Sequence, residues 1–175
     1  STRAYLYRVV LAVLPIANES GDPGMDYVSD GLTENLIAQL SGLPHLKVIA
    51  RSSVLRFKAQ APDPAKLGME LGVKAILVGR MRTENGQLKL SLEMADTRNQ
   101  RRLWGVQLLR PANDLLNLQE SLAEQVAANL GRTQPDDRKA VADTRIRTTN
   151  SQAYDLYLKG RFYADRWLPS EVEKA

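Results

Sequence analysis

The sequence has no cysteine and only one histidine, His45, among its 175 residues. Without cysteine the chain forms no disulfide, holds no metal through a thiolate and has no cysteine nucleophile. One histidine cannot make a His-based zinc site unless carboxylates supply nearly all the other ligands. A Ser-His-Asp triad would have to use His45, which lies in a Leu-Pro-His-Leu turn. The sequence therefore predicts no catalytic residue, no metal site and no cofactor.

Long apolar runs and phosphate-binding glycine loops are also missing. The longest apolar run, 9–16, falls far short of the about 20 residues that cross a membrane, so we expect no membrane insertion by this chain. Neither G-x-x-x-x-G-K-[ST] nor G-x-G-x-x-G occurs. Residues 1–130 carry 15 basic and 13 acidic side chains, and residues 131–175 carry 9 and 7. No dense basic run is available to neutralise phosphates, so we expect no nucleic-acid partner.

Hydrophobic periodicity predicts an α/β fold. A continuous aliphatic run indicates a central strand covered on both faces, and apolar stripes at helical spacing indicate amphipathic helices. Asn85-Gly86 is typical of a tight type I′ hairpin turn. The order β-α-β-α-β-β-β-α predicts a mixed five-stranded sheet with packed helices. In chain order the expected strands and helices are 9–14, 28–40, 46–50, 64–71, 73–82, 87–94, 102–110 and 115–130.

The last third of the chain changes character twice, which predicts three regions: 1–131, 132–150 and 151–175. Region 132–150 is polar and aperiodic, so we expect a linker with a short helix at 138–142. Region 151–175 concentrates half of the chain's aromatic residues and predicts a C-terminal helix that ends at Leu168-Pro169, followed by a new helix start. We expect the apolar face of 151–167 to pack on the domain or on a second copy, which leaves a homodimer open.

Two sets of polar residues are candidates for function. Asp26, Asp30 and Glu34 stand one helical turn apart, either as the start of a solvent-exposed face, or as a cation-binding, acid–base or partner-binding group. In open α/β sheets ligands bind beyond the carboxyl ends of parallel strands. An arginine and hydroxyls at these ends would bind an anion or a peptide carboxylate. The alternative is that Ser52 or Ser53 caps a short turn and that Arg51 pairs with a nearby acid. The residues at these strand ends are Asn18, Glu19, Ser20, Arg51, Ser52 and Ser53.

Several segments resemble the TolB amino-terminal-like domain. LAVLPIANESGDP at 11–23, YVSDGLTENLI at 27–37, VIARSS at 48–53, LGMELGVKAILVG at 67–79 and LW at 103–104 match its motifs in order. The sequence GVQLLR at 105–110 departs from the family's charged and aromatic continuation. The sequence SQAYDLYLKGRFY at 151–163 resembles the segment that opens tetratricopeptide repeats, with Gly160 and Tyr163 in the matching positions.

The resemblance implies a non-catalytic module in a multidomain bacterial signalling protein. Its effector would be a Ser/Thr kinase, an adenylate cyclase or a transcription regulator in parts outside this chain. It also implies a membrane-anchored parent with this portion on the extracytoplasmic side, and a cytoplasmic location is the alternative. We therefore expect a sensor or scaffold domain that binds a protein or peptide, and the alternative is a small-molecule or anion receptor at the strand-end loops.

Overall fold

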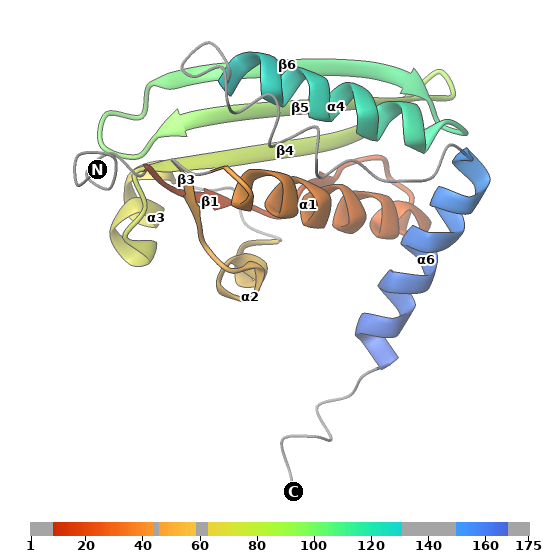
Figure 1. Cartoon of the computed structure of the whole chain (residues 1–175), viewed down its shortest axis with the longest axis horizontal. Helices are drawn as coiled ribbons and strands as arrows, with labels where there is room; N and C mark the ends of the chain where they lie inside the picture. The colour runs from red at the N-terminus through yellow and green to blue at the C-terminus, as the bar shows by residue number, and fades with distance from the viewer. Residues whose placement is uncertain (1–8, 44–45, 59–62, 131–149, 168–175) are drawn as a thin grey trace, which may run out of the picture.

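The computed structural model describes residues 9–43, 46–58, 63–130 and 150–167, which form a mixed sheet flanked by helices (Figure 1). The sheet runs β3-β1-β4-β5-β6, and β2 pairs separately with β4. The strands are β1 (Val9–Val13), β2 (Ala17–Asn18), β3 (Leu46–Val48), β4 (Ala75–Glu84), β5 (Gln87–Asp96) and β6 (Arg102–Pro111). The helices are α1 (Asp26–Ser41), α2 (Arg51–Val54), α3 (Pro64–Leu71), α4 (Leu115–Leu130) and α6 (Ser151–Trp167), with short 3-10 helices η2 (Pro23–Met25) and η3 (Leu55–Phe57).

The predicted α/β fold with a mixed sheet is confirmed, but the sheet has six strands rather than five. Parallel pairs join β1 to β3 and β4, and antiparallel pairs join β4 to β5 and β5 to β6. The sixth strand arises because Pro15 has no N–H for the ladder and interrupts the first strand. The chain then pairs with β4 again, with Ala17 opposite Arg80 and Asn18 opposite Met81.

The core lies on both faces of β1. Leu11 and Val13 belong to a large apolar cluster shared with α1, α4 and α6, whereas Ala12 and Leu14 belong to a smaller one shared with α2 and α3. Figure 1 shows α1 and α4 lying along the same face of the sheet. Because side chains on both faces of β1 are buried, the whole strand is apolar in sequence.

Local signals place most of the helix ends and turns. Asp63 accepts hydrogen bonds at the start of α3 and Gly72 ends it with φ of 64°. Asn85 and Gly86 have φ of 50° and 74°, which confirms the expected hairpin between β4 and β5. The strand expected over 46–50 is shorter, because β3 ends at Val48. Residues 51–54 form a single helical turn instead, and neither serine caps it: its N-cap is Ala50, which makes no side-chain hydrogen bond.

Several predictions lie outside the described residues. These are His45 and its turn, nearly all of the 132–150 linker with its short helix, and the break and new helix start after residue 167. The C-terminal helix itself forms as α6 and packs against α1 and α4. In Figure 1 it projects from one end of the sheet. Tyr154 and Leu158 are buried at this contact, so the helix packs on its own domain.

Candidate functional site

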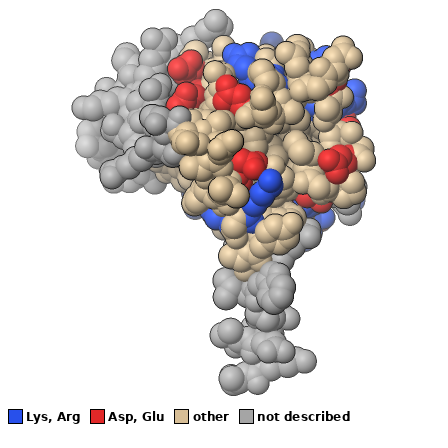
Figure 2. Space-filling view, turned by 90° about the vertical axis from the view of Figure 1, so that its right-hand side faces the viewer, with Lys and Arg blue, Asp and Glu red and all other residues tan. Residues whose placement is uncertain are grey.

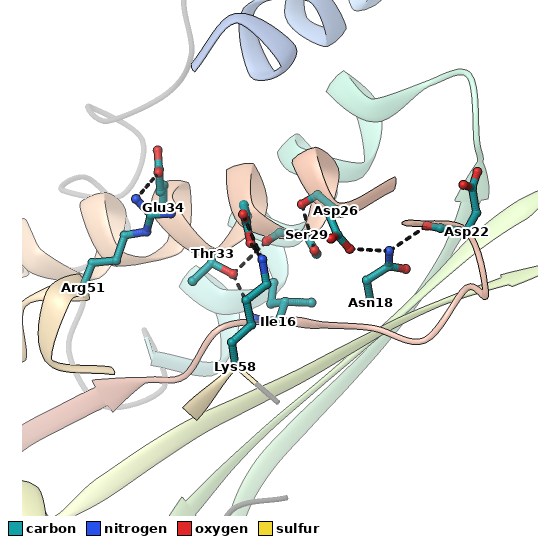
Figure 3. Close-up of polar contacts among 10 residues, drawn as sticks. Ile16, Asn18, Asp22, Asp26, Ser29, Thr33, Glu34, Arg51 and Lys58 are labelled. Carbon is teal, nitrogen blue, oxygen red and sulfur yellow. Dashed lines mark hydrogen bonds and ion pairs between the residues drawn. The ribbon is translucent and has the colours of Figure 1, made fainter. Parts of the chain in front are cut away.

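The predicted site residues lie around the first half of α1, next to the ends of β1 and β3 (Figure 3). Asn18 is the last residue of β2, Glu19 and Ser20 follow it in the loop after β2, Asp30 comes from α1, and Arg51 comes from α2. The face of α1 that carries Asp26, Asp30 and Glu34 was expected to be exposed to solvent, but it contacts neighbouring elements of the chain. We call this group of side chains the strand-end site.

The side chain of Asn18, the last residue of β2, forms hydrogen bonds that hold the loop after it in place. Its Nδ2 donates to the Asp22 carbonyl and to Asp26 Oδ1, both at 2.8 Å (Figure 3). Its Oδ1 accepts from the Ser20 amide at 3.1 Å and from the Ser20 hydroxyl at 2.6 Å. The Nδ2 end of the amide therefore attaches the loop to the N-terminus of α1, and the Oδ1 end holds Ser20 within the loop. In this structure Asn18 and Ser20 are internal supports of the loop.

Glu34 is an internal ion-pair centre. One carboxylate oxygen lies 2.7 Å from Arg51 Nη1 of α2, and the other contacts Arg161 Nη2 of α6. The Glu34 side chain is only 10% exposed. One turn earlier, Asp30 accepts from Lys58 Nζ at 2.8 Å, just after η3. The two α1 carboxylates thus hold the segment after β3 (Figure 3), and Glu34 also holds α6 through Arg161.

The remaining predicted residues have different surroundings. Glu19 lies 2.7 Å from Arg82 Nε and 4.0 Å from Arg80 Nε, which links the loop after β2 to β4. Ser52 and Ser53 are exposed on α2, and their hydroxyls donate to no other residue in the described part of the chain. The structure therefore brings Arg51 to Glu34 rather than to the two serines.

Sequence reasoning missed Thr33. Its hydroxyl donates to the Ser29 carbonyl at 2.7 Å and accepts from the Ile16 amide at 2.9 Å (Figure 3). That amide lies between the two strand segments and has no ladder partner, so a buried threonine satisfies it. A threonine within an otherwise apolar helix stripe is the only local signal for this contact.

The packing of the C-terminal helix on the domain was expected, but its polar contacts with α1 were not. The Tyr27 hydroxyl donates to Asp155 Oδ1 at 2.6 Å, and Asn35 Nδ2 donates to the Tyr154 hydroxyl at 2.6 Å. Burial raises the pKa of both phenols above the ordinary value, and Asp155 reinforces the effect at Tyr27. Burial opposes ionisation of Asp155, but hydrogen bonds from Tyr27 and Lys159 hold its pKa below the usual range. Leu158 is buried at the same contact, against Gly31 of α1.

A second surface lies on the face of β4, β5 and β6 opposite α4, which we call the outer face. It contains a hollow of about 740 Å³. Exposed side chains there include Arg80, Arg82, Gln107 and Leu109, which is 45% exposed, and Leu103 at the β-bulge of β6 is 53% exposed. The hollow is lined by Pro64, Ile76, Val78, Arg80, Arg82, Thr83, Glu84, Lys89, Ser91, Leu92, Glu93, Ala95, Arg102, Val106 and Gln107.

The described residues contain no cluster of three or more His, Asp or Glu side chains that would hold a metal ion. Across those same ranges no helix is long and apolar enough to span a bilayer. On the end of the molecule from which α6 projects, basic and acidic side chains are interspersed among neutral ones (Figure 2). That end shows no broad field of one charge.

Comparison with known proteins gives one sequence relative and a shared fold. No protein-family model matches the chain. A protein named "Putative adenylate cyclase 3" from Rhizobium meliloti (strain 1021) is 31% identical over 153 residues, which are 86% of this chain and 26% of that protein. The chain thus spans about a quarter of the length of this curated relative.

Among solved structures, lipoprotein GNA1162 from Neisseria meningitidis matches with a TM-score of 0.52 and 24% identity, over 68% of this chain and 96% of that one. This likeness shows a common fold. TolB from Acinetobacter baumannii matches with a TM-score of 0.49 and 15% identity, over 70% of this chain and 28% of TolB. That likeness is too weak to carry an argument.

Proposed function

We propose that this chain is a non-catalytic scaffold or sensor domain that binds a protein or peptide through its outer face. The observation that carries the proposal is that the part of this sheet face not covered by α2 and α3 stays exposed, with Leu109 on it and Leu103 exposed at the β-bulge of β6. Apolar side chains grouped within a polar surface mark protein-interaction sites more often than scattered single ones do. The similarity to part of a protein named as an adenylate cyclase supports a signalling parent with a cyclase effector.

The internal contacts of the strand-end site favour this scaffold role over an anion receptor. An anion at Arg51 would have to compete with the Glu34 carboxylate, which already lies 2.7 Å from the guanidinium. Ser20 is similarly engaged with Asn18. The residues that the resemblance and the strand ends single out therefore support the fold around α1.

We further propose that α6 opens a tetratricopeptide region and connects it rigidly to the domain. The support is the set of contacts from Tyr154, Asp155, Leu158 and Arg161 to α1. Leu156 and Tyr163 face away from the domain and are 67% and 58% exposed, as expected for a helix that packs on a following one. A partner on the outer face would then be held at a fixed position relative to the helices that follow.

Site-specific photocrosslinking in the cells that produce the protein tests the outer face. A photoreactive amino acid at Leu103 or at Leu109 should give the same discrete protein adduct, and an excess of unlabelled chain should suppress it. Met69 on α3, which is 81% exposed, is the matched control position and should give no such adduct. Equal adducts from all three positions, or none from the two β6 positions, would contradict an interaction through this face.

A further inference from the structure

The hollow on the outer face has an excess of positive charge. Its lining contains the four cations Arg80, Arg82, Lys89 and Arg102 but only the two acids Glu84 and Glu93. Each acid already faces a cation: Glu84 lies 3.6 Å from Lys89, and Glu93 lies 3.7 Å from Arg102. Arg82 has its partner outside the hollow, in Glu19 at 2.7 Å.

Arg80 is the least neutralised of these cations. Its Nε is 4.0 Å from Glu19, whose carboxylate is already engaged by Arg82 at the shorter distance. The Arg80 side chain is 61% exposed. The sheet register places Ser91 opposite Arg80, and Gln107 opposite Ser91. A row of hydrogen-bond donors thus crosses the three strands at the middle of the hollow.

Neighbouring residues complete a surface with both polar and apolar parts. The Arg102 guanidinium lies over Gly105, where a Cβ would collide with it. Because residue 105 has no side chain, Arg102 can take this position and face Glu93. The departure from the family pattern at residue 105 therefore has a structural role. On β4, Val78 lines the same hollow next to Arg80, together with Pro64 at the start of α3.

We propose that this hollow binds an extended acidic segment of a partner protein, with a carboxylate on Arg80 and an apolar side chain on Val78 and Pro64. The inference rests on the proposed function and specifies the chemistry of the partner. A guanidinium binds a carboxylate through two parallel hydrogen bonds, and the hydroxyl of Ser91 and the amide of Gln107 supply further donors. Val78 and Pro64 favour a peptide over nucleic acid, because a sugar-phosphate backbone has no apolar side chain to place on them.

Fluorescence anisotropy with the 175-residue chain tests the proposal. The probe is a fluorescein-labelled peptide of alternating Glu and Val, compared with the same peptide carrying Gln for Glu and with labelled oligothymidylate. The acidic peptide should bind most tightly, and its affinity should fall as salt is added. Arg80→Gln should weaken binding about tenfold or more, as expected for loss of a charge-assisted hydrogen bond. Arg110→Gln is the control, because Arg110 contacts Asn117 of α4 on the other side of the sheet and has the same charge.

Three outcomes would overturn the inference: equal affinity for the Glu and Gln peptides, tighter binding of the oligonucleotide, or equal weakening by the two arginine variants. Circular dichroism and thermal unfolding establish that both variants fold. If the acidic peptide does not bind but photoreactive residues at positions 103 and 109 still crosslink a protein, the acidic chemistry of the partner is wrong and the proposed function stands. If crosslinking from these positions fails as well, both are wrong.

Discussion

Leu158 of α6 occupies the space that a side chain on Gly31 of α1 would need. A Cβ built on Gly31 would lie 2.5 Å from Leu158 Cδ2. Both residues are buried, and Tyr154, one turn before Leu158, is fully buried beside them. The close approach of the two helices therefore depends on the absence of a side chain at one position of α1.

Gly31→Ala should loosen the attachment of α6. Overpacking of this kind costs about 1–3 kcal/mol, and the helix propensity gained by alanine, about 1 kcal/mol, offsets only part of it. Amide hydrogen exchange over 151–164 should become about tenfold faster. Gly160→Ala is the matched control, because nothing lies within 4 Å of the position that its Cβ would take, and it should slow exchange in α6. Slower exchange in both variants would show that the two helices do not pack this closely.

Glu34→Gln should loosen two segments at once. Glu34 contacts Arg51 of α2 and Arg161 of α6, so loss of its charge weakens both contacts by about 1–3 kcal/mol in total. Hydrogen exchange should accelerate over 51–57 and over 151–164. Asp30→Asn, one turn away, removes only the pair with Lys58 and should cost about 0.2–1 kcal/mol, with α6 unaffected. Identical exchange patterns in the two variants would contradict a linking role for Glu34.

Alkaline pH should destabilise the α1–α6 contact. Tyr27 and Tyr154 have pKa values raised above the ordinary value, first by burial. Above about pH 10 the unfolded phenols lose their protons while the folded ones keep them. Their contribution to stability is therefore complete below about pH 10 and is lost as the pH rises through the folded pKa values.

The free energy of unfolding from denaturant titrations, and tyrosinate ultraviolet absorbance, measure this alkaline loss. The double variant Tyr27→Phe/Tyr154→Phe should show a shallower decrease of stability above about pH 10. Tyr157→Phe is the control, because Tyr157 is 49% exposed on α6. A decrease unchanged in the double variant would exclude these two phenols as its cause.

Local patterns predicted most of the fold because its elements are encoded within short stretches. The hairpin at Asn85-Gly86 and the αL end of α3 at Gly72 depend on residues at the turn itself. The strand-end site was only partly predictable. The loops at the ends of β1 and β3 do adjoin α1, but the hypothesis of an anion site did not include the partners that the side chains meet in the structure.

The partners that α1 and α6 find in each other are distant in sequence, which is why no spacing rule reveals them. Tyr27 and Asp155 are 128 positions apart, and Asn35 and Tyr154 are 119 apart. Periodicity shows that α6 has an apolar face, but it does not show which helix covers that face. The sixth strand was missed for another reason: β2 has two residues, too few to produce an alternating pattern.

Gly68→Ala should destabilise the domain even though it improves helix propensity. A Cβ on Gly68 of α3 would lie 2.6 Å from Thr97 Cβ, an atom fixed to the backbone. Thr97 is buried and its hydroxyl donates to the Val73 carbonyl at 2.8 Å, so it cannot move without loss of that bond. We expect a loss of about 1–3 kcal/mol in the free energy of unfolding, measured by denaturant titration. Met69→Ala, at the next and exposed position, should change it by less than about 0.5 kcal/mol. A gain in stability from Gly68→Ala would show that α3 does not pack directly on the turn after β5.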